Sequence, residues 1–128
     1  MLITNAVTRK WTVDEYLRIA EGGAFNKGPR VELIEGEIVV MTPSKEPHAW
    51  AIRKGNRLLF QLYGNTHEVG VQVPLKANQM SLPEPDFTLV PIGAASPTAH
   101  LTGPDLVIEV AFSSLAFDLG EKAELYAK

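Results

Sequence analysis

The segment LVIEVAF (residues 106–112) is apolar except for Glu109 at its centre. Its content of β-branched and aromatic residues predicts a strand that packs in the core, and we expect it in the middle of a sheet. A buried carboxylate is strongly unfavourable unless it has a partner, reaches water or takes up a proton. The fold must therefore give the Glu109 carboxylate a partner, water or a proton. Which of these it provides indicates the function of the chain.

Strand alternation divides this segment into two faces. Ile108 and Val110 lie on one face, whereas Glu109 shares the other with the smaller Val107 and Ala111. The smaller neighbours leave room beside the carboxylate for a second charged group.

A second carboxylate is expected nearby, in the segment PEPDFTLV (residues 83–90). Asp86 follows two prolines, which are typical of an edge strand or of the start of a strand. If the two strands are neighbours, Asp86 and Glu109 converge, and two like charges at short range need a cation between them to stay ionised. Oxygen-rich pairs of this kind suit magnesium or manganese.

The last predicted helix supplies a cation of its own. At about 100° per residue, Leu115, Leu119, Lys122 and Tyr126 fall within roughly 60° of arc, so Lys122 lies inside an apolar stripe. Because the strand runs directly into this helix, the stripe should pack over the sheet and point Lys122 towards Glu109. Two acids and an inward lysine match the requirements of metal-assisted phosphodiester hydrolysis.

The remaining segments alternate between helix and strand signals. Thr12 and Glu15 form a capping-box pattern that begins a short helix, which the Gly22–Gly23 pair ends. Glu35–Gly36 separates VELI from EIVVM, as in a two-residue hairpin.

A longer helix is predicted over residues 48–63, with Arg53, Lys54 and Arg57 on its solvated side. Two extended segments, HEVGVQVPLKA and PDFTLVP, follow it and are joined by a polar turn near Asn78. The order αββαββ-loop-βα predicts an α+β or α/β fold with a mixed β-sheet, built as a single domain over residues 1–128.

Composition excludes several classes of protein. The longest apolar run is far below the roughly 20 residues that span a membrane, and the N-terminus lacks a signal-peptide pattern. The chain has no cysteine, which fits a cytoplasmic protein. The formal net charge of −3 argues against indiscriminate nucleic-acid binding but is compatible with a local basic surface.

The final segment, AELYAK, carries no helix stop signal, and no strand follows it. We therefore expect a C-terminally truncated domain that lacks further strands. An exposed sheet edge or apolar patch left in this way favours association, so a homo-oligomer is expected.

Several of these segments together resemble the Uma-type putative restriction endonuclease family, within the PD-(D/E)XK nuclease superfamily. The similar stretches are TVDEYL, RVELIEGEIVVMTPS with a following His, PEPDFTLV, GPDLVIEVAFSSL and DLGEKAELYA. The resemblance implies the restriction-endonuclease-like fold, a mixed β-sheet flanked by helices, with Asp86 and Glu109 as the metal-binding acids. It also implies that Lys122 takes the place of the superfamily's lysine, because Ala111 stands at the usual position two residues after the second acid.

The function expected from the residues and the resemblance is that of a magnesium-dependent DNA endonuclease. Asp86 and Glu109 would bind magnesium or manganese, and Lys122 would assist the attacking water. Glu32, in VELIEGE, is an additional candidate acid, and His48 is either a further site residue or a hydrogen-bonded histidine at a helix start. The alternative is a catalytically inactive DNA- or protein-interaction module that retains the nuclease fold; Phe112, where the family often has a polar residue, favours it.

Overall fold

The computed structural model describes residues 6–43, 45–111 and 122–127. Its elements follow the predicted order: α1 (Val13–Glu21), β1 (Val31–Ile34), β2 (Glu37–Val40), α2 (Glu46–Tyr63), β3 (His67–Val71), β4 (Phe87–Pro91), β5 (Leu106–Ile108) and α4 (Ala123–Ala127). The α+β class is confirmed. Phe112 and the expected start of the last helix near Ser113 lie outside the described residues.

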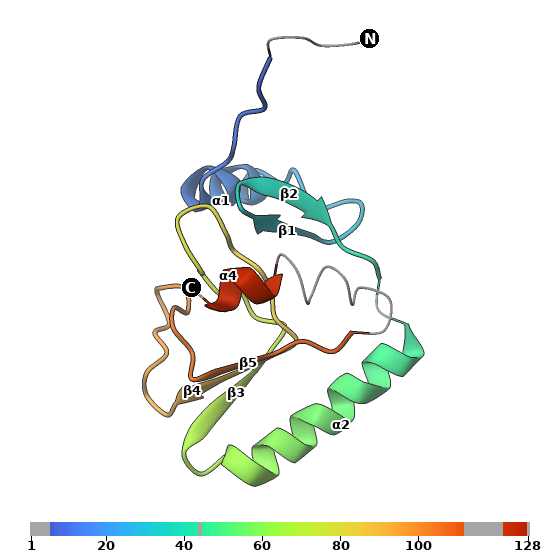
Figure 1. The fold of residues 1–128 in the computed structure, drawn as a ribbon, viewed down its shortest axis with the longest axis vertical. Helices are drawn as coiled ribbons and strands as arrows, with labels where there is room; N and C mark the ends of the chain where they lie inside the picture. Colours follow the sequence, from blue (N-terminus) through green and yellow to red (C-terminus); the bar gives the residue numbers. More distant parts are fainter. Residues whose placement is uncertain (1–5, 44, 112–121, 128) are drawn as a thin grey trace.

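Helix α1 and the β1–β2 hairpin pack together at one end of the molecule, above the second sheet (Figure 1). The capping box is present, since the side chain of Thr12 accepts from the backbone N–H of Glu15 while the Glu15 carboxylate accepts from the Thr12 N–H. The predicted hairpin is also present. Its two turn residues, Glu35 and Gly36, have φ of 48° and 80°, as a two-residue turn between twisted strands requires.

The second sheet has the order β3-β4-β5, with every pair antiparallel. Two corrections follow for the described residues. The expected mixed sheet is instead two small antiparallel sheets, and parallel pairing is limited to an isolated bridge between Leu75 and Leu101. The central strand is β4 and not β5, because β4 carries the nearly continuous buried run (Phe87–Val90) that a central position needs.

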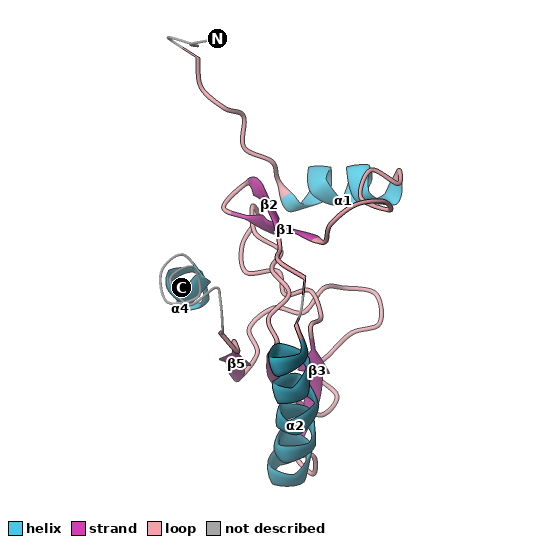
Figure 2. Cartoon of the chain, turned by 90° about the vertical axis from the view of Figure 1, so that its right-hand side faces the viewer, coloured by secondary structure: helices cyan, strands magenta, loops and turns pink. Residues whose placement is uncertain are grey.

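Helix α2 covers one face of this second sheet (Figure 2). Leu59 is its buried residue and packs with Phe87 and Leu89. Gly55 permits the close approach, because a Cβ at this position would come within 2.6 Å of the Phe87 ring. The packing places the first turn of α2, which contains His48, beside the start of β4.

Helix α4 lies between the hairpin and the second sheet along the long axis of the molecule, as Figures 1 and 2 both show. Strand β5 ends at Ile108, so the predicted strand over residues 106–112 is shorter than expected and Glu109 follows it. The cause is a partner distant in the sequence, because the Val110 N–H bonds to the Asp86 carboxylate and not to a neighbouring strand. None of the described helices is long and apolar enough to cross a membrane.

Candidate active site

Three charged side chains are almost completely buried where the two sheets and α4 meet. Glu32, Asp86 and Lys122 are 0 %, 6 % and 2 % exposed. Charged residues are rarely buried unless they are paired, since desolvation opposes the ionised form. All described buried side-chain polar atoms have a hydrogen-bond partner. These buried charges therefore form a network in which every buried polar atom has a hydrogen-bond partner.

Lys122 is the centre of the network. It directly precedes α4, and its Nζ lies 3.2 Å from Oε1 of Glu32 and 3.2 Å from Oε1 of Glu109. Burial by itself favours the neutral amine, but the two carboxylates outweigh it and raise the pKa of Lys122 above its ordinary value. The side chain therefore remains a cation that donates hydrogen bonds.

Glu109 receives two hydrogen bonds on the same oxygen. Its Oε1 accepts from the Lys122 ammonium and, at 2.9 Å, from the hydroxyl of Tyr126. Burial nevertheless raises the pKa of Glu109 to about 7, with the nearby charge of Asp86 adding to the rise and Lys122 and Tyr126 opposing it. Glu109 is thus poised between its two protonation states near neutral pH.

Glu32 approaches from strand β1, on the opposite side of the lysine. Its Oε1 accepts from the backbone N–H of Glu84 at 3.0 Å, and its Oε2 accepts from Arg30 at 3.1 Å. Arg30 also lies 3.8 Å from the carboxylate of Glu84, whose pKa is raised by burial. The Arg30 side chain is 44 % exposed, so this end of the network reaches the surface.

Asp86 precedes β4 and is fixed by three donors. Its Oδ2 accepts from the Val110 N–H at 2.8 Å and lies 3.2 Å from Nε2 of His48, and its Oδ1 accepts from the Gln72 amide at 3.3 Å. The Val110 bond ties Asp86 to the residue that follows Glu109. The negative charge of Asp86 contributes to the raised pKa of Glu109, because two like charges at short range disfavour ionisation.

The structure therefore brings together the residues that the sequence singled out. Lys122 contacts Glu109 as expected, and it also contacts Glu32, whereas Asp86 joins them through Val110 and is paired with His48. Sequence reasoning missed Gln72, Arg30 and Glu84 as partners. Tyr126 shares a helical face with Lys122 in the sequence, but nothing in the sequence signals that its hydroxyl reaches Glu109.

The oxygen donors of this site suit a hard divalent cation. Magnesium commonly uses one or two protein carboxylates and keeps several waters, and Asp86 and Glu109 are the carboxylates that would hold it here. Among the described residues, no group of three or more His, Asp or Glu side chains is arranged to hold a metal ion. Any cation bound here would therefore complete its coordination with water and with substrate oxygens.

The two antiparallel sheets and the helices make this an α+β protein, in an arrangement consistent with a nuclease-like fold. The model of the Uma2 family, described as putative restriction endonucleases, matches residues 13–128 of the chain. The match covers both sheets and every described residue of the network, and the chain belongs to this family. Comparison with curated proteins gives no match.

Proposed function

We propose that this protein is a metal-dependent endonuclease that hydrolyses phosphodiester bonds in DNA. The observation that carries the proposal is the buried ammonium of Lys122, held between Glu32 and Glu109, with buried Asp86 bonded to Val110, the residue after Glu109. Membership of a family of restriction-endonuclease type supports the choice of DNA as the substrate.

In this proposal, Asp86 and Glu109 hold magnesium or manganese, which polarises the phosphate and lowers the pKa of a water when bound. Val110 and Gln72 orient Asp86 through hydrogen bonds to its two oxygens. Lys122 donates hydrogen bonds and places positive charge beside the scissile phosphate. It does not act as a base, because its raised pKa keeps it protonated.

Glu32 and Tyr126 keep these groups in position. Glu32 shares the Lys122 ammonium with Glu109, and Tyr126 donates to the Glu109 oxygen that also receives the lysine. His48 pairs with Asp86 and its side chain is 19 % exposed, and in this proposal it contacts the incoming strand.

The test is nicking of supercoiled plasmid with magnesium or manganese and with a chelator. Asp86→Asn and Glu109→Gln remove one anionic ligand each and should abolish nicking. Lys122→Arg keeps the charge but changes its geometry and should reduce nicking strongly. Glu21→Gln, an exposed acid on α1, is the matched control and should behave as the unmodified chain. Nicking that survives both acid substitutions would falsify the proposal.

A second candidate function is a catalytically inactive module that binds DNA or protein with the same fold. One observation favours it, because the Lys122 ammonium is itself the counter-charge of the inner oxygens of Glu32 and Glu109. The two candidates are separated by calorimetric titration with magnesium. Heat of binding that disappears in Asp86→Asn supports the nuclease, whereas no binding together with no nicking supports the inactive module.

A further inference from the structure

Helix α2 carries a basic surface on the side that faces away from the sheet. Residues 47–63 include Arg53, Lys54 and Arg57 but no Asp or Glu, although the whole chain has a net charge of −3. Within the described residues, Arg53 pairs with Glu46, whereas Lys54 and Arg57 have no carboxylate partner. Positive charge is therefore concentrated on this helix.

Two large aromatic side chains lie among these cations. Trp50 is 57 % exposed and Phe60 is 66 % exposed, and the Lys54 ammonium lies 5.9 Å from the centre of the Trp50 ring. At about 100° per residue, the basic and aromatic residues share roughly 120° of arc, opposite the buried Leu59. We call this the α2 outer face: Trp50, Arg53, Lys54, Arg57 and Phe60.

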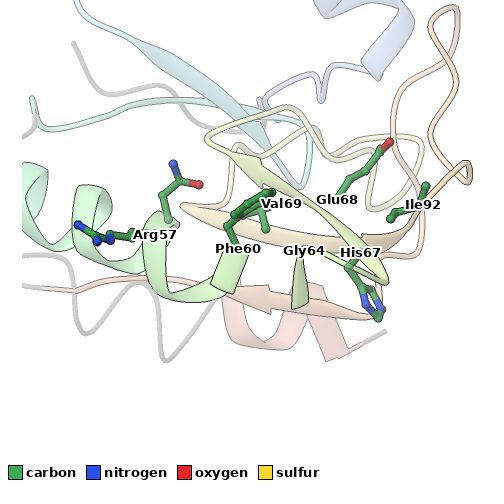
Figure 3. Close-up of a pocket in the computed structure, with 8 residues that line it drawn as sticks. Arg57, Phe60, Gly64, His67, Glu68, Val69 and Ile92 are labelled. Atoms are coloured by element: carbon green, nitrogen blue, oxygen red, sulfur yellow. The ribbon is translucent and has the colours of Figure 1, made fainter. Parts of the chain in front are cut away.

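An open pocket of about 480 Å³ adjoins the C-terminal end of this face. Figure 3 shows its walls, with Arg57 and Phe60 contributed by α2, Val69 by β3 and Ile92 by the segment after β4. Gly64 allows the Phe60 ring to lie over the end of the helix, because a Cβ there would come within 2.9 Å of the ring. Asn56 adds an amide to the same pocket.

These features together match the chemistry of a single strand of nucleic acid. Proteins bind single strands with a basic track for the phosphates and with exposed aromatic rings on which unpaired bases stack. The pocket is lined by an aromatic ring, an amide, a guanidinium and the carboxylate of Glu68. These groups can stack on and hydrogen-bond to one unstacked base, while the phosphates follow the cations of the α2 outer face. The flat stack of base pairs in a duplex offers no free base to such a pocket.

We propose that the α2 outer face binds single-stranded DNA and that the adjoining pocket accepts one unstacked base. The proposal goes beyond the nuclease function, since binding at this surface does not require hydrolysis. His48, beside Asp86, lies on the side of α2 that faces the sheet, whereas the α2 outer face lies on the opposite side of the helix. The proposed anchor for an unpaired strand is therefore separate from the candidate active site.

The experiment measures the fluorescence anisotropy of a labelled 12-nucleotide DNA with the full chain in chelator, so that cleavage cannot interfere. Lys54→Gln combined with Arg57→Gln should weaken binding and reduce the salt-dependence slope by about 1.4, since each phosphate that a side chain neutralises adds about 0.7 to the slope. Arg18→Gln combined with Lys27→Gln makes the same charge change on exposed residues elsewhere and should leave the slope unchanged.

The contribution of the aromatic rings to DNA binding is tested with a second variant and its matched control. Phe60→Ser should weaken binding roughly 5- to 150-fold, which is the effect expected from removing one base-stacking ring. Leu62→Ser removes an apolar side chain of similar exposure (62 %) from another side of the same helix, and it should leave affinity unchanged. In a Trp11→Phe background, the remaining fluorescence of Trp50 should be quenched when the strand binds.

Three results would overturn the proposal. The first is equal weakening by the α2 variants and by their controls, and the second is tighter binding of duplex DNA or of an RNA strand than of single-stranded DNA. The third is self-association that Phe60→Ser abolishes while DNA binding is absent, because the face would then be a contact between copies of the chain. Failure of the nuclease proposal changes none of these readouts, since they are made without divalent cations.

Discussion

The Nζ of Lys122 lies 3.2 Å from Oε1 of Glu109, which joins the start of α4 to the segment that follows β5. The same ammonium lies 3.2 Å from Oε1 of Glu32 on β1. One side chain therefore connects the hairpin, the second sheet and the last described helix. A buried ion pair of this kind is costly to break, because each partner left behind is an uncompensated buried charge.

The first prediction concerns this connection. Lys122→Met keeps the apolar stem but leaves Glu32 and Glu109 without their shared cation, so the free energy of unfolding should fall by about 3–5 kcal/mol at pH 8. Urea denaturation followed by circular dichroism measures the loss. Adding Glu32→Gln to Lys122→Met removes one of the two carboxylates that lose Lys122, the one that keeps only Arg30 as a cation, and should restore part of the stability. A double variant less stable than Lys122→Met would contradict this explanation.

The second prediction is the effect of pH on stability through Glu109. Because burial raises its pKa from 4.5 to about 7, the folded state holds this proton more tightly than the unfolded chain does. The stabilising contribution is complete below pH 4.5 and is lost as the pH rises through 7. The loss is on the order of 3 kcal/mol, from about 1.4 kcal/mol per unit of pKa difference.

Denaturation midpoints at pH 5, 6, 7 and 8 measure this effect. Glu109→Gln carries no titrating proton, so its stability should change much less across this range and should exceed that of the unmodified chain at pH 8. Glu21→Gln is the control and should follow the unmodified chain. Parallel curves for Glu109→Gln and the unmodified chain would show that another group titrates.

The third prediction concerns Gln72, which has a positive φ of 52° and donates both its amide to Asp86 Oδ1 and its backbone N–H to Asp86 O. Gln72→Gly relieves the left-handed backbone but removes the amide, so stability should change by less than about 1 kcal/mol. If Asp86 holds a cation, its affinity should fall because Asp86 is less well oriented. Gln72→Asn is the control, because asparagine also tolerates this backbone conformation but its shorter side chain places the amide farther from Asp86.

Much of the fold could be predicted from local signals. The capping box at Thr12, the turn at Glu35–Gly36 and the long helix are each determined by short-range chemistry, and the structure contains all three. The position of β5 could not be predicted, since an apolar strand such as LVIEVAF has the same appearance at the centre and at the edge of a sheet. Its early end depends on Asp86, a long-range partner of the Val110 N–H.

The candidate site likewise has residues that the sequence could predict and residues that it could not. Glu109 and Lys122 could be paired from strand alternation and helical periodicity, because both lie in one continuous stretch of sequence. Glu32 comes from a strand 77 residues before Glu109, so only the resemblance to a family pointed to it. Gln72 could not be found, because its role depends on a positive φ in a loop, which a glutamine does not signal.

The last prediction links the pKa of Glu109 to the proposed metal site. A cation binds the ionised carboxylate, and a group with a pKa of about 7 is mostly protonated at pH 6 and mostly ionised at pH 8. Magnesium or manganese affinity should therefore rise by about tenfold from pH 6 to pH 8, with protons released into the buffer at pH 6. Calorimetry in two buffers of different ionisation enthalpy measures the released protons directly.

Tyr126→Phe removes a hydrogen bond that favours the ionised form of Glu109, so the rise in affinity should move to higher pH. Metal binding of equal strength at pH 6 and pH 8 would remove Glu109 from the proposed set of ligands and leave Asp86 as the carboxylate to test next.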